Sequence, residues 1–236
     1  MHFETLSSIN PSLVKTWQDK IFLTFDIDWA HDAVLEYAIN LVEQADVAAT
    51  WFVTHDTPLL NRLRANPKFE LGIHPNFNFL LEGDARNGAN AEEVVDRLFE
   101  TIPEANSVRT HCLVISTPLL AMFKRKGLTH DSSIYIPADS GIALKPYVDS
   151  LGIARCPYFF GDYSACKSVN FSPVGDGLKI YDFHPIHVYL NTLTILIDCQ
   201  ACERASPPPF LLSSRCRGAT ITIQSRGCVQ AHFCNA

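Results

Sequence analysis

The sequence predicts an α/β fold made of parallel strand–helix–strand units. A near-continuous apolar run over residues 21–27, IFLTFDI, is typical of a strand that is covered on both faces. Apolar residues at helical spacing follow over 33–45, and strand-like and helix-like segments go on alternating to about residue 190. Seven such strands fit a TIM-like barrel with one unit missing, or a doubly wound open sheet. Periodicity does not separate these two topologies.

The first half of the chain supplies three strands and two helices. We expect Asp32 to cap the first helix, because a side-chain oxygen at this position accepts a backbone N–H of the first turn. Pro58 suits the first position of the second helix, where its missing N–H would have no partner in any case. The predicted segments are strand 21–27, helix 33–45, strand 47–55, helix 58–67 and strand 69–74.

The second half begins with a helix over 91–102, whose acidic first turn suits the positive end of the helix dipole. The helix over 118–127 starts with Pro118 and stops at Gly127, as helices commonly do. Residues 137–152 show no regular pattern. The remaining segments are predicted as strands: 107–115, 129–136, 153–160 and 178–190.

The chain changes character after residue 192. The segment 193–236 contains three consecutive prolines, five of the eight cysteines and no acidic residue after Glu203. Its apolar residues show little helical period, and ATITI over 219–223 is a candidate for a short strand. We therefore expect a barrel domain over 1–192 and an atypical, poorly packed tail over 193–236. An altered reading frame would produce such a composition.

The composition gives no reason to expect nucleic acid or an anionic membrane as partner, because the net charge is -6. No apolar run approaches the roughly 18 residues of a membrane span. The N-terminal residues show no basic-then-apolar signal pattern, so we expect a cytoplasmic protein. Cysteines are usually free thiols in that compartment.

Ionisable residues gather at the ends of the predicted strands, where parallel βα folds carry their chemistry. Asp26 and Asp28 end the first strand, and side chains two residues apart in a regular strand point the same way. Burying ionised groups costs several kcal/mol each unless they pair or bind a metal, so these residues need a common explanation. The other members are His74, Arg109, His111, Asp131, Asp182, His184 and His187.

Five short motifs occur in a fixed order: TFDID, ATWFV, GIHPNFN, VRTH and DFHPIH. Together they resemble the polysaccharide deacetylases, the carbohydrate esterases (family 4) with a NodB homology domain, and especially members linked to surface-polysaccharide biosynthesis. The resemblance covers about residues 20–192. It implies a distorted (β/α)7 barrel and a hydrolase that removes acetyl groups from sugars with a divalent metal, often zinc.

The resemblance also implies roles for single residues. Asp26 matches the catalytic base and Asp28 a metal ligand, although the family usually has these two adjacent and Ile27 separates them here. Arg109 matches the arginine that orients the base, and a positive neighbour keeps an aspartate ionised. His184 matches the late histidine that acts as general acid. His187, three residues on, is a rival for this role.

The second metal-binding motif departs from the family pattern. His74 matches its first histidine, but Asn78 stands where the second would be. Asn is an oxygen ligand and suits zinc less well than imidazole does. Either Asn78 binds more weakly, or His111 supplies the third ligand, or the metal differs from zinc, with cobalt and nickel as candidates.

The sequence therefore predicts a metal-dependent deacetylase of an acetylated sugar. The substrate would be a nucleotide-, lipid- or oligosaccharide-linked intermediate of cell-surface glycan synthesis. The alternatives are a non-catalytic glycan-binding protein with a degraded metal site and a hydrolase of non-sugar amides. Trp29 and Phe77 could line a sugar site, although packing is the commoner role of large aromatic side chains. His55 is expected to be peripheral.

Overall fold

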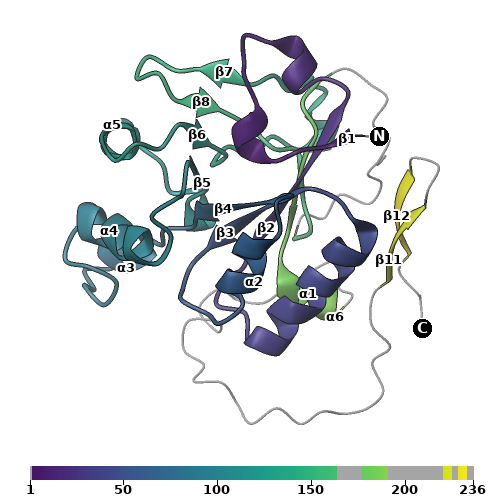
Figure 1. The fold of residues 1–236 in the computed structure, drawn as a ribbon. Helices are drawn as coiled ribbons and strands as arrows, with labels where there is room; N and C mark the ends of the chain where they lie inside the picture. Colours follow the sequence, from purple (N-terminus) through teal and green to yellow (C-terminus); the bar gives the residue numbers. More distant parts are fainter. Residues whose placement is uncertain (1, 164–176, 191–219, 225–227, 233–236) are drawn as a thin grey trace.

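The computed structural model describes residues 2–163, 177–190, 220–224 and 228–232. One large sheet dominates them (Figure 1). Its strands in spatial order are β7 (Tyr147–Val148), β8 (Ala154–Arg155), β6 (His130–Asp131), β5 (Ser107–Val108), β4 (Phe69–Ile73), β3 (Ala49–Val53), β2 (Lys20–Asp26), β10 (Ile180–Phe183) and β9 (Phe160–Gly161), with β1 (His2–Phe3) beside β2.

The strand order decides between the two topologies that the sequence left open. All neighbouring strands are parallel except the pair β7 and β8. Strands β2 to β6 lie in chain order, β8 follows, and β10 joins the other side of β2. A doubly wound sheet would reverse its order in the middle, whereas right-handed crossovers in one direction place the helices on one face. The predicted (β/α)7 barrel is confirmed as a curled half-barrel, because no ladder joins β7 to β9 among the described residues.

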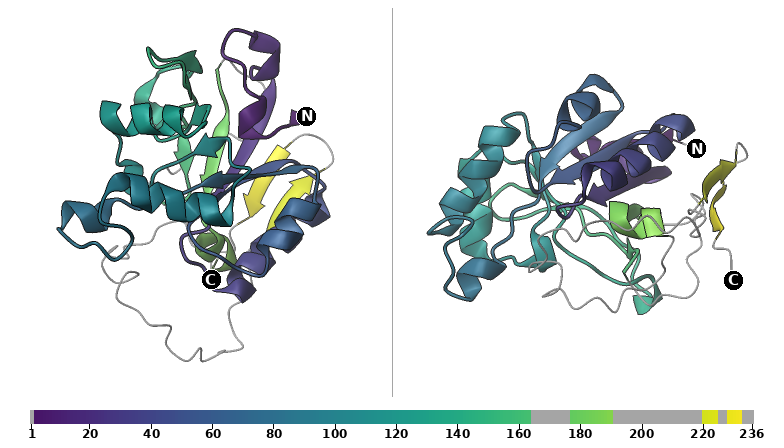
Figure 2. Two further views of the ribbon diagram at one scale, coloured as in Figure 1. Left: turned by 60° about the vertical axis from the view of Figure 1, so that its left-hand side comes forward. Right: turned by 90° about the horizontal axis from the view of Figure 1, so that it is seen from below.

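The helices lie along the outer side of the curled sheet. Helices α3, α4 and α5 lie together over one part of this outer side, and α1, α2 and α6 lie together over the neighbouring part (Figures 1 and 2). Tyr37 of α1 meets Tyr189 of α6 edge to face, with ring centroids 5.4 Å apart. The helices are α1 (Asp32–Ala45), α2 (Leu60–Ala65), α3 (Asn78–Leu81), α4 (Ala91–Thr101), α5 (Thr117–Arg125) and α6 (Pro185–Leu190). Short 3-10 turns cover Leu6–Ser8, Val14–Thr16, His111–Leu113 and Ala138–Ser140.

Side chains alternate between the two faces of each strand, as the period of two requires. On β2, Ile21, Leu23 and Phe25 belong to the core under the helices, and Phe22 belongs to a second core inside the barrel. The outer core continues into β3, where the ring of Trp51 stacks on Phe25 at 4.3 Å. This alternation places every second residue of a strand, and the polar residue at its end, on the inner face.

The N-terminal segment packs into the inner core. Leu6 and Trp17 are buried against that core. The N–H of Leu6 donates to Thr50 Oγ1 at 2.9 Å, and the N–H of Ser7 donates to the carboxylate of Glu70 at 2.9 Å. Thr50 and Glu70 lie on inward positions of β3 and β4, well before the carboxyl ends of these strands. This contact leaves the opposite end of the barrel for the polar residues.

Three predicted strands are much shorter than expected. The segment 107–115 pairs only over Ser107–Val108, because Cys112 and Leu113 then adopt φ values of 52° and 57°, which a strand does not allow. The segment 129–136 pairs over His130–Asp131 and again at a single bridge between Tyr135 and Tyr158. The segment 153–160 divides into β8, this bridge and the first residue of β9.

The last predicted strand, 178–190, is wrong after Phe183. Pro185 starts helix α6, since proline lacks the N–H that a ladder needs and suits the first turn of a helix. His187 is therefore helical and does not lie in an extended segment. The predicted cap of α1 is also wrong, because Nδ1 of His31 accepts the Ala33 N–H at 3.2 Å. Asp32 instead accepts the hydroxyl of Thr57.

The remaining expectations are tested only in part. The strand expected over 219–223 is present as β11 (Thr220–Gln224), paired with β12 (Cys228–His232). The expected boundary at residue 193 lies outside the described residues. Cys112 and Cys156 are free thiols. No helix in the part that the structure describes is long and apolar enough to span a membrane, and the cytoplasmic location stays a prediction.

Candidate active site

The polar residues that the sequence singled out converge at the carboxyl end of the barrel. Asp26 ends β2, His74 follows β4, Arg109 follows β5 and His184 follows β10. Each lies on an inward position of its strand, so strand alternation alone brings these four side chains to one place. They are buried or nearly so, with Arg109 fully buried and His74 2% exposed.

Asp28 reaches the same place by a different route. The chain turns sharply after β2, with the N–H of Ala30 donating to the Ile27 carbonyl at 2.8 Å. Asp28 and Trp29, the two central residues of this turn, have φ values of 37° and 52°. Turns of this kind favour Gly, Asn and Asp, and an aromatic residue there is strained. The regular strand expected through Asp28 is therefore wrong, although both carboxylates do face one site.

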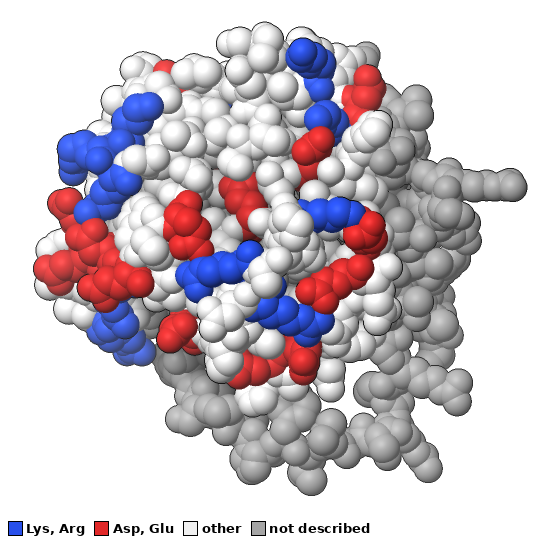
Figure 3. Space-filling view, in the orientation of Figure 1, with Lys and Arg blue, Asp and Glu red and all other residues white. Residues whose placement is uncertain are grey.

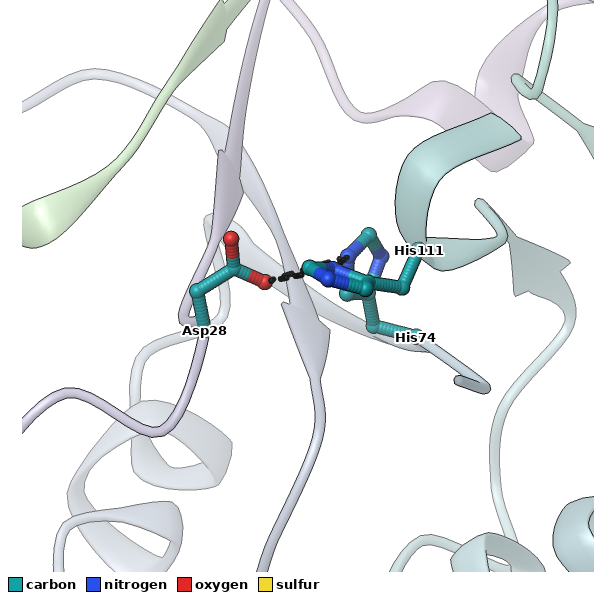
Figure 4. Close-up of side chains that lie close together, drawn as sticks. All are labelled: Asp28, His74 and His111. Carbon is teal, nitrogen blue, oxygen red and sulfur yellow. Dashed lines mark hydrogen bonds and ion pairs between the residues drawn. The ribbon is translucent and has the colours of Figure 1, made fainter. Parts of the chain in front are cut away.

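Three potential ligand atoms form a triangle at this turn (Figure 4). Oδ1 of Asp28 lies 3.2 Å from Nε2 of His74 and 3.3 Å from Nδ1 of His111. The two ring nitrogens are 3.3 Å apart. Burial acts to raise the pKa of Asp28, but its polar contacts with His111, His184 and His74 outweigh burial and hold the pKa well below its usual range.

The triangle fits a divalent metal. Tetrahedral zinc with ligand bonds of about 2.0–2.1 Å separates its ligand atoms by about 3.3 Å, which is close to the observed edges. Oδ1 of Asp28 is buried and has no hydrogen bond that meets normal geometry among the described residues. Two imidazoles and one carboxylate are also a donor set that zinc prefers. Asp28, His74 and His111 would hold the ion.

Asn78 occupies a different environment from these three residues. It is the first residue of α3, and its N–H donates to Oδ1 of Asn76 at 2.9 Å. Hydrogen bonds from His111 and from the Asn78 side chain lower the pKa of the Cys112 thiol. The geometry favours His111 over Asn78 as third ligand, and the choice between them stays a prediction.

Arg109 joins the predicted base to a second buried carboxylate. Its Nη1 lies 3.0 Å from Oδ1 of Asp26 and 2.5 Å from Oδ1 of Asp182. The rings of Phe52 and Tyr158 flank the guanidinium, with centroids 4.6 and 4.5 Å away. Burial raises the pKa of Asp182 well above its usual range, and Arg109 offsets this only in part. The guanidinium of Arg109 thus pairs with both Asp26 and Asp182, and all three side chains are buried from solvent.

His184 lies on the opposite side of Asp28 from the other two histidines. Its Nε2 is 3.3 Å from Oδ2 of Asp28, and its Nδ1 is 2.8 Å from Oδ1 of Asp162. The backbone N–H of His184 also donates to Oδ2 of Asp162 at 2.7 Å. Burial acts to lower the pKa of His184, but Asp162 and Asp28 outweigh it and raise this pKa well above its ordinary value.

Sequence reasoning missed Asp162, which also binds His187 at 3.0 Å through Nδ1. The signal was present, because Asp162 follows the apolar run that ends in β9, just as Asp26 ends β2. Asp182 was noticed but received no role. Asp131 lies apart from the site, where it pairs with Arg155 at 2.7 Å and accepts the Ser133 hydroxyl.

Metal binding is expected to strengthen as the pH rises. Burial lowers the pKa of His111, but the Asp28 carboxylate outweighs it and raises this pKa to about 10. The metal-free imidazole therefore carries a proton at neutral pH that a ligand must release. Zinc affinity should increase about tenfold per pH unit between pH 6 and 8. Competition with a chromophoric chelator measures this slope, and a flat profile in wild type would contradict His111 as a ligand.

A parallel half-barrel whose carboxyl-end loops gather carboxylates and histidines has the site arrangement of (β/α) barrel enzymes. The chain belongs to the WbmS-like polysaccharide deacetylase family, whose sequence profile matches residues 23–196. This finding confirms the resemblance to the polysaccharide deacetylases.

Two solved structures are similar to this chain. WbmS of Bordetella bronchiseptica, assigned as a polysaccharide deacetylase involved in O-antigen biosynthesis, is 44% identical and has a TM-score of 0.74. The match covers 81% of this chain and 82% of WbmS. A polysaccharide deacetylase assigned in Mycobacterium smegmatis is 16% identical over 70% of this chain and 77% of that one, with a TM-score of 0.46. Among curated proteins, none matches this chain.

Proposed function

We propose that this protein removes an acetyl group by hydrolysis from a sugar of a cell-surface polysaccharide, with a divalent metal, zinc, as cofactor. The observation that carries this proposal is the position of Asp28. Its Oδ1 faces His74 and His111, and its Oδ2 faces His184. Because Oδ2 of the proposed base Asp26 lies 3.6 Å from Nε2 of His74, a ligand set, a base and an acid surround one point. The family and the name of its Bordetella relative support a glycan such as O-antigen as the source of the substrate.

When bound, the metal would polarise the acetyl carbonyl, lower the pKa of water and stabilise the negative charge that develops on the carbonyl oxygen. The residues of the chain handle the protons. Asp26, oriented by Arg109 at 3.0 Å, accepts a proton from the attacking water. His184 donates its proton to the departing nitrogen or oxygen of the sugar. Asp162 holds Nδ1 of His184 at 2.8 Å and so directs Nε2 toward the reacting atoms.

The same geometry favours His184 over His187 as the acid. His184 contacts Asp28 directly, whereas His187 contacts Asp162 through Nδ1 and lies beside the His184 ring, with centroids 5.0 Å apart. His187 therefore helps to hold Asp162. An amine anion is a poor leaving group, so an amide substrate needs the acid more than an ester does.

Removing the acid should affect amides more than esters. We expect His184→Ala to lower kcat for an N-acetyl sugar by about 10²–10⁴-fold, and to lower hydrolysis of p-nitrophenyl acetate far less. His187→Ala should lower kcat for the sugar by less than about tenfold, because the direct contact with Asp28 remains. Steady-state kinetics on both substrates measure these effects. Equal losses in the two variants would contradict the assignment.

The function itself is tested by screening the zinc-, cobalt- and nickel-loaded protein for acetate release. The panel contains N- and O-acetylated sugars beside linear and cyclic amides, and Asp26→Asn serves as the inactive control. Turnover of sugars that Asp26→Asn abolishes supports the proposal. Turnover confined to non-sugar amides points to another hydrolase. Binding of glycans without turnover by the metal-loaded wild type points to a binding protein.

A further inference from the structure

A second group of potential metal ligands lies at the edge of the His184 ring that faces away from Asp28. One ligand atom from each of Asp162, His184 and His187 lies within 4.8 Å of the other two. Asp162 directly follows β9, His184 directly follows β10, and His187 lies in the first turn of α6. Two imidazoles and one carboxylate form the same donor set as the triangle at Asp28, and this set suits zinc. The proposed function uses the group only to hold His184.

Both histidines direct the same ring nitrogen at one carboxylate oxygen. Nδ1 of His184 lies 2.8 Å from Oδ1 of Asp162, and Nδ1 of His187 lies 3.0 Å from the same oxygen. The two rings share a face because they are three residues apart at the start of a helix, where the N–H of His187 donates to the His184 carbonyl at 3.0 Å. Zinc separates its ligand atoms by about 3.3 Å, so these two contacts need to lengthen only by a few tenths of an ångström.

The carboxylate of Asp162 is held in place independently of the two rings. Its Oδ2 accepts the backbone N–H of His184 at 2.7 Å, and Oδ1 stays directed at the ring nitrogens. The side chains of Asp162 and His187 are each 10% exposed, and that of His184 is 12% exposed. The group is therefore shielded from bulk water but not sealed, so that an ion can enter and take a water molecule as its fourth ligand.

This group should bind zinc more weakly than the triangle at Asp28. Oδ1 of Asp28 has no hydrogen bond of normal geometry among the described residues, whereas Oδ1 of Asp162 accepts two. An ion at Asp162 must replace these hydrogen bonds, which offsets part of its binding energy. On the face of the molecule in Figure 3, acidic side chains lie next to basic ones, so this face is a poor competitor for a second ion.

We propose that Asp162, His184 and His187 form a second, inhibitory zinc site, which is occupied only when zinc is in excess. The inference rests on the proposed function, because it assigns a way to regulate the same acid. Zinc on Nδ1 of His184 takes the place of the proton that Asp162 holds there, and this proton passes to water. Nε2 can then give up its own proton only by forming an imidazolate, so His184 stops acting as an acid. An amide substrate needs that acid, whereas an ester with a good leaving group does not.

Titration of the zinc-loaded protein with further zinc tests this proposal. Calorimetry should show a second, weaker equivalent in wild type. When this equivalent is bound, kcat for an N-acetyl sugar should fall at least about tenfold, and hydrolysis of p-nitrophenyl acetate should fall by less than about twofold. Cobalt in place of zinc gives a readout that is independent of activity, because the visible absorption of bound cobalt should rise in two steps.

His187→Asn is the variant that separates a metal ligand from a hydrogen-bond donor. The amide of Asn can still donate to Asp162, but it suits zinc less well than imidazole does. This variant and His187→Ala should bind only the first equivalent, and excess zinc should change the kcat of each by less than about twofold. His31→Asn removes an exposed imidazole and keeps a capping residue at α1, so this matched control should retain both equivalents and the inhibition.

The outcomes separate this inference from the proposed function. A second equivalent that both His187 variants lose, without turnover of any acetylated sugar, supports the site and contradicts the deacetylase. Turnover with only one equivalent bound, or with a second equivalent that both variants keep, overturns the site and leaves the deacetylase standing. Inhibition that is absent, or equal for amide and ester, overturns the block of the acid. A protein that binds no zinc and turns over no sugar overturns both.

Discussion

Arg109→Leu is expected to lower the free energy of unfolding by about 3–5 kcal/mol, because it leaves two buried carboxylates without their cation. Asp26 and Asp182 both depend on Nη1 of this fully buried side chain. The rings of Phe52 and Tyr158 flank its guanidinium, with centroids 4.6 and 4.5 Å away. Urea denaturation of wild type and variant, monitored by tryptophan fluorescence, measures the loss.

The free energy of unfolding that Arg109→Leu loses should grow as the pH rises. Burial raises the pKa of Asp182 above its unfolded value, and removing Arg109 removes the main opposing charge. A group with a raised folded pKa contributes its stability below its unfolded pKa, and this stability is lost as the pH rises through the folded pKa. The deficit of Arg109→Leu is therefore smaller at pH 5 than at pH 8.

The double variant Arg109→Leu/Asp182→Leu provides the matched control. It removes one buried charge of each sign, so it should recover about half of the lost stability or more. A single variant that costs less than about 1 kcal/mol, with no dependence on pH, would contradict the buried charge network.

Asp28→Ala is expected to remove the bound metal and to reduce deacetylation below detection. Asp28 links all three histidines of the site, at 3.2–3.3 Å from each. Wild type should hold about one equivalent of zinc and should melt at a higher temperature when zinc is added, since a ligand of the native state stabilises it. Elemental analysis and thermal melting with and without zinc measure both effects.

Asp28→Asn is the comparison that separates charge from backbone conformation. Asn tolerates the left-handed region that Asp28 occupies at φ 37°, and it keeps the shape of the side chain. It should remain folded and bind zinc more weakly, because a neutral amide is a poorer ligand than a carboxylate. If Asp28→Ala kept a full equivalent of zinc, the metal would lie elsewhere in the protein. In that case His74→Ala would also keep its full equivalent of zinc.

The order of buried strands and the residues at their ends could be predicted from the sequence. Apolar runs with a polar residue at the end located Asp26, His74 and His184, because strand alternation fixes the face of each residue before any partner is known. The shared inward face of Arg109 and Asp26 follows from the same parity. These relations are local, or they depend only on the strands being parallel. The sequence pattern of a single chain is therefore enough to predict them.

Only the tertiary structure decided the remaining contacts. The turn at Asp28 and Trp29 is left-handed, and although aspartate tolerates this conformation, tryptophan at its second position does not favour it, so local propensity does not predict the turn. His111 reaches the site from a 3-10 turn that the sequence read as a strand, and Asp162 reaches His184 across a gap of 22 residues. Asp182 faces Asp26 because β10 closes onto β2, a pairing set by the curl of the sheet.

The sequence by itself thus determined the fold class, the family and the end of the barrel at which chemistry takes place. The structure decided which side chains lie close together there. It also placed His74 at the edge of a pocket that Trp29 and α4 help to line. The physical reason is range: periodicity and strand-end polarity act over neighbouring residues, whereas ligand triangles, shared cations and pockets depend on distances between segments far apart in the chain.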